Sequence, residues 1–242
     1  MYLFDTNAVI YFLSSGVLFG LTLFTYHSFI IFIPLFTLSL LASRYKRIRK
    51  RLFFFITPFI LFLSVSLTSS YLNSSAKFTT TSIFNNEQIV YERVDNFRKD
   101  TKEINFLFDK IHSRYFALPY HFLQNYLLSF SPEFLFDKGG EKLVHNLEGF
   151  GNLYLVDSLL IIVGLLGIFY FREKNKKLII TWILIAQVSC ALTTDAPNST
   201  RLFVLMPALL LLSSYGIWTI FSSLGKRGFG KIIICVLVLT YI

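Results

Sequence analysis

Charged residues, histidines and cysteines are all scarce in this sequence. Charged side chains make up 15% of the 242 residues and hydrophobic ones 54%, so a water-soluble domain of this size would have more apolar surface than it could bury. Cys190 and Cys235 both lie in apolar segments, with no second Cys or His nearby at the spacing of metal ligands. These scarcities argue against a soluble fold, and we expect neither a metal nor a cofactor.

The motifs of soluble enzymes are also missing from the longest polar stretch, residues 70–152. It contains no glycine-rich phosphate loop, no Gly-x-Ser-x-Gly elbow, no His-Glu-x-x-His and no Cys-x-x-Cys pair. The first apolar run has no basic region and no small-residue cleavage site ahead of it, so we do not expect a removed signal peptide. A self-contained soluble catalytic module is therefore not expected.

What the sequence has in abundance is apolar and aromatic side chains. The mean hydropathy is +0.59, and the 28 Phe and 13 Tyr residues suit lipid-facing helices and the headgroup level of a bilayer. The net charge of +9 does not indicate nucleic acid, because the basic residues separate apolar runs and form no continuous stripe. We predict an all-α, multi-pass integral membrane protein.

Seven segments are candidate membrane spans, since about 20 mostly apolar residues cross a bilayer and shorter runs can cross with little tilt. They are residues 8–24, 27–43, 52–69, 153–171, 178–194, 202–221 and 232 onward. The last apolar run amounts to about half a span, so we expect either an incomplete chain or an end that only dips into the membrane. The predicted organisation is three spans in 1–69, an extracytoplasmic loop in 70–152, and four spans in 153–242, the last one possibly truncated.

The orientation follows from the short basic loops, which stay on the cytoplasmic side of a membrane. Residues 44–51, 172–177 and 226–231 are such loops, and counting the spans between them places all three on one side. The long stretch 70–152 and the short loop 195–201 then lie on the other side. We predict a plasma or inner membrane protein whose large loop faces away from the cytoplasm.

The large loop is too long for a plain connection, and long loops are usually functional. Residues 86–111 carry apolar side chains at roughly helical spacing, which predicts one or two amphipathic helices. Residues 115–130 mix Tyr and Phe with leucines, which predicts a helix lying in or dipping into the membrane interface. Pro132, the pair 139–140 and the stretch 149–151 indicate turns before the next span.

Several short stretches follow one another in a fixed order along the chain: residues 24–28, 82–85, 124–127, 130–136, His145 with 149–154, 192–201, 205–207 and 215–216. Together they resemble the later two-thirds of polytopic bacterial glycosyltransferases of the GT-C superfamily, similar to the protein mannosyltransferases, the lipid A aminoarabinose transferases and glycosyltransferase family 39. The resemblance implies transfer of a sugar from a polyprenyl-phosphate carrier to an acceptor at the outer membrane face of the cell envelope. The family's putative base lies in an acidic first outer loop, which has no counterpart before Tyr26, so we expect the base on a separate N-terminal part.

Transfer from a lipid phosphate needs a base for the acceptor and positive charge or donors on the departing phosphate. Arg201 suits bidentate phosphate binding at the outer mouth of a span, although an anchoring Arg that snorkels looks the same in sequence. Asp195 either orients this Arg or initiates a turn and caps the next helix. Asp157, near the outer end of a span, is expected to pair with a neighbouring helix, because an unpaired carboxylate is costly there.

Five further residues complete the candidate donor-binding set: His145, His27, Tyr26, Asn125 and Tyr126. His145 lies in a loop, where it either donates to phosphate or sugar or is simply solvated. His27 and Tyr26 lie at an outer helix turn, where packing or anchoring is the alternative. Asn125 and Tyr126 either contact sugar or anchor the interfacial helix. The segments 73–75 and 198–200 are glycosylation sequons on the outer side.

A second functional class is a non-enzymatic membrane component, such as a subunit of a lipid-carrier flippase or transporter, or an assembly scaffold. The missing acidic first loop favours that class, whereas the order of the family-like stretches favours the transferase. Expected partners are a polyprenyl-phosphate-linked sugar, membrane lipids and an acceptor, and no nucleic acid.

Overall fold

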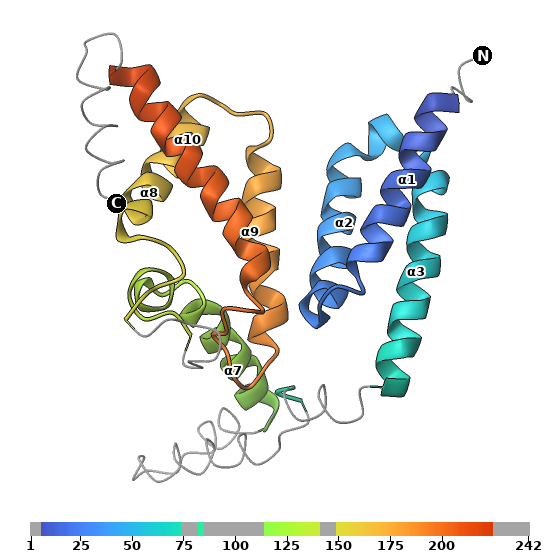
Figure 1. The fold of residues 1–242 in the computed structure, drawn as a ribbon, viewed down its shortest axis with the longest axis horizontal. Helices are drawn as coiled ribbons and strands as arrows, with labels where there is room; N and C mark the ends of the chain where they lie inside the picture. Colours follow the sequence, from blue (N-terminus) through green and yellow to red (C-terminus); the bar gives the residue numbers. More distant parts are fainter. Residues whose placement is uncertain (1–5, 74–81, 85–113, 141–148, 225–242) are drawn as a thin grey trace. The chain divides into compact units, whose positions relative to one another are not determined.

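The computed structural model describes residues 6–73, 82–84, 114–140 and 149–224. Within these residues every regular element is a helix, and the one pairing of extended backbone is an isolated bridge between Ser82 and Thr193. The chain divides into two compact units (Figure 1). An N-terminal unit comprises residues 1–125 and 191–195, and a C-terminal unit comprises 126–190 and 196–242. Each unit is described by itself.

The N-terminal unit is built on three apolar helices, α1 (Thr6–Thr22), α2 (His27–Ile48) and α3 (Leu52–Asn73). Helices α1 and α3 pack closely because Gly16 lies against the backbone of Phe55 and Gly20 lies against the side chain of Phe62. A β-carbon at either glycine would collide with its neighbour, so small residues permit this approach, as is common between membrane helices.

The C-terminal unit contains α8 (Leu155–Tyr170), α9 (Lys176–Ala191), the short 3₁₀ helix η3 (Phe203–Leu205) and α10 (Met206–Leu224). Helices α8 and α10 cross at two facing glycines. Gly164 lies on the backbone of Leu212 and Gly216, and Gly216 lies on the backbone of Leu160 and Gly164. This crossing sets the relative positions of all polar side chains on the two helices.

A shorter helix, α7 (Arg114–Leu128), precedes the C-terminal helices, and the boundary between the units falls within it. It is followed by a π-helical turn, η1 (Glu133–Asp137). The N–H of Leu153, just before α8, donates to the carbonyl of Leu135 in η1 (2.8 Å), and this bond holds η1 beside the beginning of α8. The predicted helix over 115–130 is thus confirmed as a helix. One of the predicted turns, at Pro132, is instead the beginning of a π-helical turn.

The polarity of α7 is reversed relative to a helix on a water-facing surface. His121, Asn125 and Ser129 recur every fourth residue and are buried, whereas Leu123 and Leu127 are 52% and 59% exposed. A helix in contact with water buries its apolar stripe and exposes its polar one. The opposite arrangement is the one that contact with lipid would favour, and the interfacial position of this segment stays a prediction.

Helices form in each of the first six segments expected to be spans. Three stretches are long and apolar enough to cross a membrane, namely His27–Lys46, Leu52–Ser69 and Phe203–Ser223, while Asn7–Thr22 and Leu155–Tyr170 are apolar but shorter. The described part of the chain is therefore all-helical, and three of its helices are long and apolar enough to cross a bilayer. The expected seventh span and the amphipathic helices of 86–111 fall outside the described residues.

Candidate functional site

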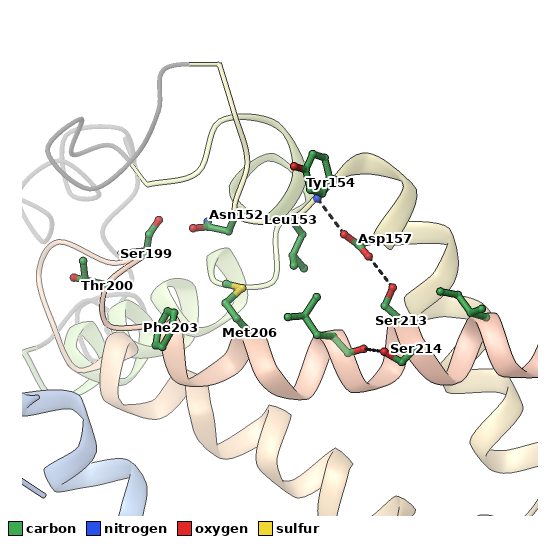
Figure 2. Close-up of a pocket in the computed structure, with 12 residues that line it drawn as sticks. Asn152, Leu153, Tyr154, Asp157, Ser199, Thr200, Phe203, Met206, Ser213 and Ser214 are labelled. Carbon is green, nitrogen blue, oxygen red and sulfur yellow. Dashed lines mark hydrogen bonds between the residues drawn. The ribbon is translucent and has the colours of Figure 1, made fainter. Parts of the chain in front are cut away.

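A groove of about 580 Å³ runs along one face of α10 in the C-terminal unit (Figure 2). Its lining comes from the turn before α8 and the first turn of α8, the loop before α10, and residues of η3 and α10 that are mostly three or four positions apart. The lining residues are Asn152, Leu153, Tyr154, Asp157, Ser199, Thr200, Phe203, Met206, Leu210, Ser213, Ser214 and Ile217. We call it the α10 groove.

The α10 groove has a polar end and a mostly apolar body. Asn152, Ser199 and Thr200 lie together at one end, beside the beginning of α10 (Figure 2). From there the groove follows Met206, Leu210 and Ile217 along a helix that is long and apolar enough to cross a bilayer. Asp157, Ser213 and Ser214 also line this stretch, and hydrogen bonds within the protein hold all three side chains. A molecule with a polar head and a hydrocarbon tail matches this division, because each of its parts would meet a surface of its own kind.

Asp157 is the charged residue in the wall of the α10 groove, and it is 2% exposed. Its Oδ1 accepts a hydrogen bond from Ser213 Oγ on α10 (2.7 Å), and its Oδ2 accepts one from the N–H of Tyr154, which caps α8 (3.2 Å). A carboxylate at the third position of a helix also interacts favourably with the helix dipole. The expected pairing of Asp157 with a neighbouring helix is confirmed.

The polar end is shaped by Asn198, whose side chain closes the loop before α10. Asn198 Oδ1 accepts hydrogen bonds from Thr200 N (3.1 Å), Thr200 Oγ1 (2.6 Å) and Arg201 N (3.4 Å), and the residue is 7% exposed. Such a turn is typical of Asn. It directs Ser199 and Thr200 to the groove and makes Asn198 a poor glycosylation acceptor, since its amide is buried.

Arg201 follows directly and is half-buried at the entrance to η3 and α10. It does not line the α10 groove itself, but its neighbour Thr200 does. Asp195 belongs to the N-terminal unit and Arg201 to the C-terminal unit, so the idea that this acid orients this Arg stays a prediction. Of the sequence-predicted site residues, Arg201 is the one adjacent to the groove lining.

Asn125 and Tyr126 each bond to the main chain of α9 or of the residues just after it. Asn125 is 3% exposed and donates from Nδ2 to the carbonyls of Thr193 (2.8 Å) and Ala191 (3.3 Å). The Tyr126 hydroxyl donates to the carbonyl of Leu184 (2.9 Å), and burial raises the pKa of Tyr126. These bonds anchor α7, which is one of the two roles considered for both residues. Sugar binding stays a prediction.

Tyr26 and His27 lie where α2 begins in the N-terminal unit, with Tyr26 as its N-cap residue and their rings 6.5 Å apart. Both are exposed. His145 lies outside the described residues. The α10 groove lies in the C-terminal unit, so a role of these three residues in donor binding stays a prediction.

Sequence reasoning did not single out Asn152, Thr200 or Ser213 as binding residues, although Asn152 and Thr200 lie in stretches that resemble the GT-C superfamily. Ser213 carried a signal, because a hydroxyl in an apolar span marks a position that needs a partner. Asn152 donates from Nδ2 to the carbonyl of Phe134 (2.9 Å), so it holds η1 near the beginning of α8. Among the described residues, no three His, Cys, Asp or Glu side chains are grouped to hold a metal ion.

Comparisons with protein-family models, with curated proteins and with solved structures find no match for this chain.

Proposed function

We propose that this chain is part of a membrane glycosyltransferase that takes a sugar from a polyprenyl-phosphate donor and passes it to an acceptor at the outer membrane face. The order of the short stretches that resemble the GT-C superfamily motivates the reaction. The observation that carries the proposal is the α10 groove, whose polar end and apolar body match a lipid-linked donor.

In this proposal the isoprenoid chain lies along Met206, Leu210 and Ile217, and its phosphate lies at the polar end. The lining contains no basic side chain, so the phosphate charge has to be met from beside the groove. Arg201 is adjacent to Thr200 in the chain and carries five donors in a planar fork that suits phosphate oxygens. As the sugar leaves, negative charge grows on the phosphate, and a fixed guanidinium lowers the barrier.

The acceptor hydroxyl also requires a base. Asp157 is the carboxylate in the groove wall, and two hydrogen bonds already hold it. We therefore assign it to positioning α8 against α10, and expect the base on a separate N-terminal part.

Two pairs of variants test the proposal in membranes that hold the chain together with that N-terminal part. Leu210 and Leu211 are both 49% exposed, but only Leu210 lines the α10 groove, so Leu210→Trp should block transfer of a labelled sugar and Leu211→Trp should not. Arg201→Ala should lower transfer by about ten- to a hundredfold, the value of one or two charge-assisted hydrogen bonds. Lys174→Ala, in a basic loop, is its control. Equal activity within either pair would contradict the proposed site.

The engagement of Asp157 by two donors favours a second function, a lipid-carrier flippase or transport component, because such a protein needs the groove but no base. Binding of polyprenyl phosphate that is lost in Leu210→Trp, without transfer in the presence of any N-terminal partner, would support this alternative.

A further inference from the structure

A second groove in the C-terminal unit lies between α8 and α9, with α10 as its floor. It has a volume of about 550 Å³. Its walls are Leu155, Ile162 and Leu165 of α8 and Ile180 and Leu184 of α9. Apart from the hydroxyl of Ser158, which donates to the carbonyl of Leu155 in its own helix (2.6 Å), the side chains around it are hydrocarbon or aromatic. We call it the α8/α9 groove.

One end of the α8/α9 groove is lined by Phe130, Pro132 and Phe136, from the segment that includes η1, and we call these three residues the roof. The rings of Tyr126 and Phe130 meet edge to face, 5.6 Å apart, and Tyr126 donates to the carbonyl of Leu184 in the groove wall. The roof is thus tied to α9, and its outer surface carries the exposed ion pair of Glu133 and Lys138. Charges above and hydrocarbon below reproduce the order of groups in one leaflet of a bilayer.

The length of the groove identifies the kind of chain that fits. Leu165 lies ten positions after Leu155 on α8, which at a rise of 1.5 Å per position gives roughly 15 Å. A bilayer has a hydrocarbon core of about 30 Å, so the groove is as deep as one leaflet. A phospholipid acyl chain has this reach.

The surroundings of the groove are also apolar and exposed. Leu127 on α7 and Leu155 and Ile162 on α8 are more than half exposed, which suits contact with lipid better than contact with water. The groove opens into this apolar surface, so lipid chains are the molecules at its mouth.

We propose that the α8/α9 groove is a binding site for one acyl chain of a glycerophospholipid in the leaflet on the η1 side, whose headgroup lies beside the roof at η1. This inference does not depend on the proposed function, because it concerns a different groove and a structural lipid. The bound chain would fill the space between α8 and α9 and stabilise the roof above it.

The test compares Ile162→Trp with Leu159→Trp in the full chain. Ile162 is 57% exposed and lines the groove, and Leu159, on the same helix, is 62% exposed and lines neither groove. The protein is extracted in mild detergent from vesicles of phosphatidylethanolamine and phosphatidylglycerol, and retained lipid is counted by native mass spectrometry. We expect one phospholipid on the wild type and on Leu159→Trp. On Ile162→Trp the occupancy should be lower than on the wild type by about tenfold or more, since an indole displaces several buried methylenes.

A photo-crosslinking measurement guards against a misfolded variant. Benzoylphenylalanine replaces Leu165, which lines the groove, or Leu166, which does not. After detergent washing, the probe at 165 should still label phospholipid and the probe at 166 should not. The proposal would be overturned if the wild type carried no phospholipid or if the two Trp variants retained lipid equally. It would also be overturned if the probe at 165 labelled another segment of the chain, a second copy or a polyprenyl lipid.

Discussion

Ser213 on α10 donates a 2.7 Å hydrogen bond to Oδ1 of Asp157 on α8, although 56 positions separate them in the chain. Both residues are buried, at 5% and 2% exposure. A carboxylate in an apolar bundle is costly without donors, and this bond links the two helices that form the wall and floor of the α10 groove.

Ser213→Ala should lower the free energy of unfolding by about 1–2 kcal/mol, because it removes one donor from a buried carboxylate. Ser214→Ala is the control, since the Ser214 hydroxyl bonds to the carbonyl of Leu210 in its own helix and its loss should cost less than about 0.5 kcal/mol. Unfolding by titration with dodecyl sulfate in mixed micelles measures both. Equal losses would show that the bond between α8 and α10 adds no stability.

Asp157→Asn and Asp157→Leu should differ in the same assay. The amide oxygen of Asn still accepts from Ser213 or Tyr154, whereas Leu leaves both donors without this acceptor, at a cost of about 1–3 kcal/mol for each buried group. We expect Asp157→Leu to be the less stable variant by about 2 kcal/mol. A Leu variant as stable as wild type would mean that the carboxylate is dispensable for packing.

Gly164→Leu and Gly216→Leu should separate α8 from α10. A β-carbon at either position collides with backbone of the facing helix, which cannot move aside as a flexible side chain can. We expect a loss of about 1–3 kcal/mol or failure to fold. Leu166→Ala, on a 65% exposed position of α8, should change stability little. Thermal unfolding followed by circular dichroism separates these outcomes, and unchanged unfolding of Gly164→Leu would refute the close crossing.

Asn198→Ala should loosen the loop before α10, because the acceptor for three donors is lost. Asn198→Asp keeps an oxygen in that position and should stay close to wild type, while Ala should cost about 1–2 kcal/mol. Limited proteolysis within 195–201 is the readout. If the Asp variant is cleaved as fast as the Ala variant, the side-chain oxygen does not hold the loop.

The exposed pair of Glu133 and Lys138 (2.6 Å) predicts a pH effect of defined sign. The hydrogen bond and charge of Lys138 lower the pKa of the Glu133 carboxyl in the folded state. A lowered folded pKa means that the contribution to stability is present above the unfolded pKa and is lost as pH falls through the folded value. Lys138→Met should return the pKa of Glu133 toward the ordinary value for Glu, as measured by carbon-13 NMR titration. An unchanged titration would show that no such pair forms in solution.

Much of the helical framework could be predicted from composition and the positions of basic residues. Apolar runs bounded by basic segments predicted helices at six places where the structure has them, and the aromatic run before Ser131 predicted α7. The reversed polarity of α7 could not be read in the same way. Its sequence shows one polar and one apolar stripe, and only the bonds of Asn125 to the main chain decide which of them lies inside.

The candidate site was harder to predict than the helices. Arg201 was singled out for its charge near a span, yet the α10 groove is lined by Thr200, Asn152 and Ser213, which are ordinary polar residues in sequence. Sequence by itself determined that the chain is an all-helical protein suited to a bilayer, because length and apolarity of each segment are local properties. Tertiary structure alone decided that Asp157 meets Ser213, because that meeting depends on how closely α8 and α10 cross at Gly164 and Gly216.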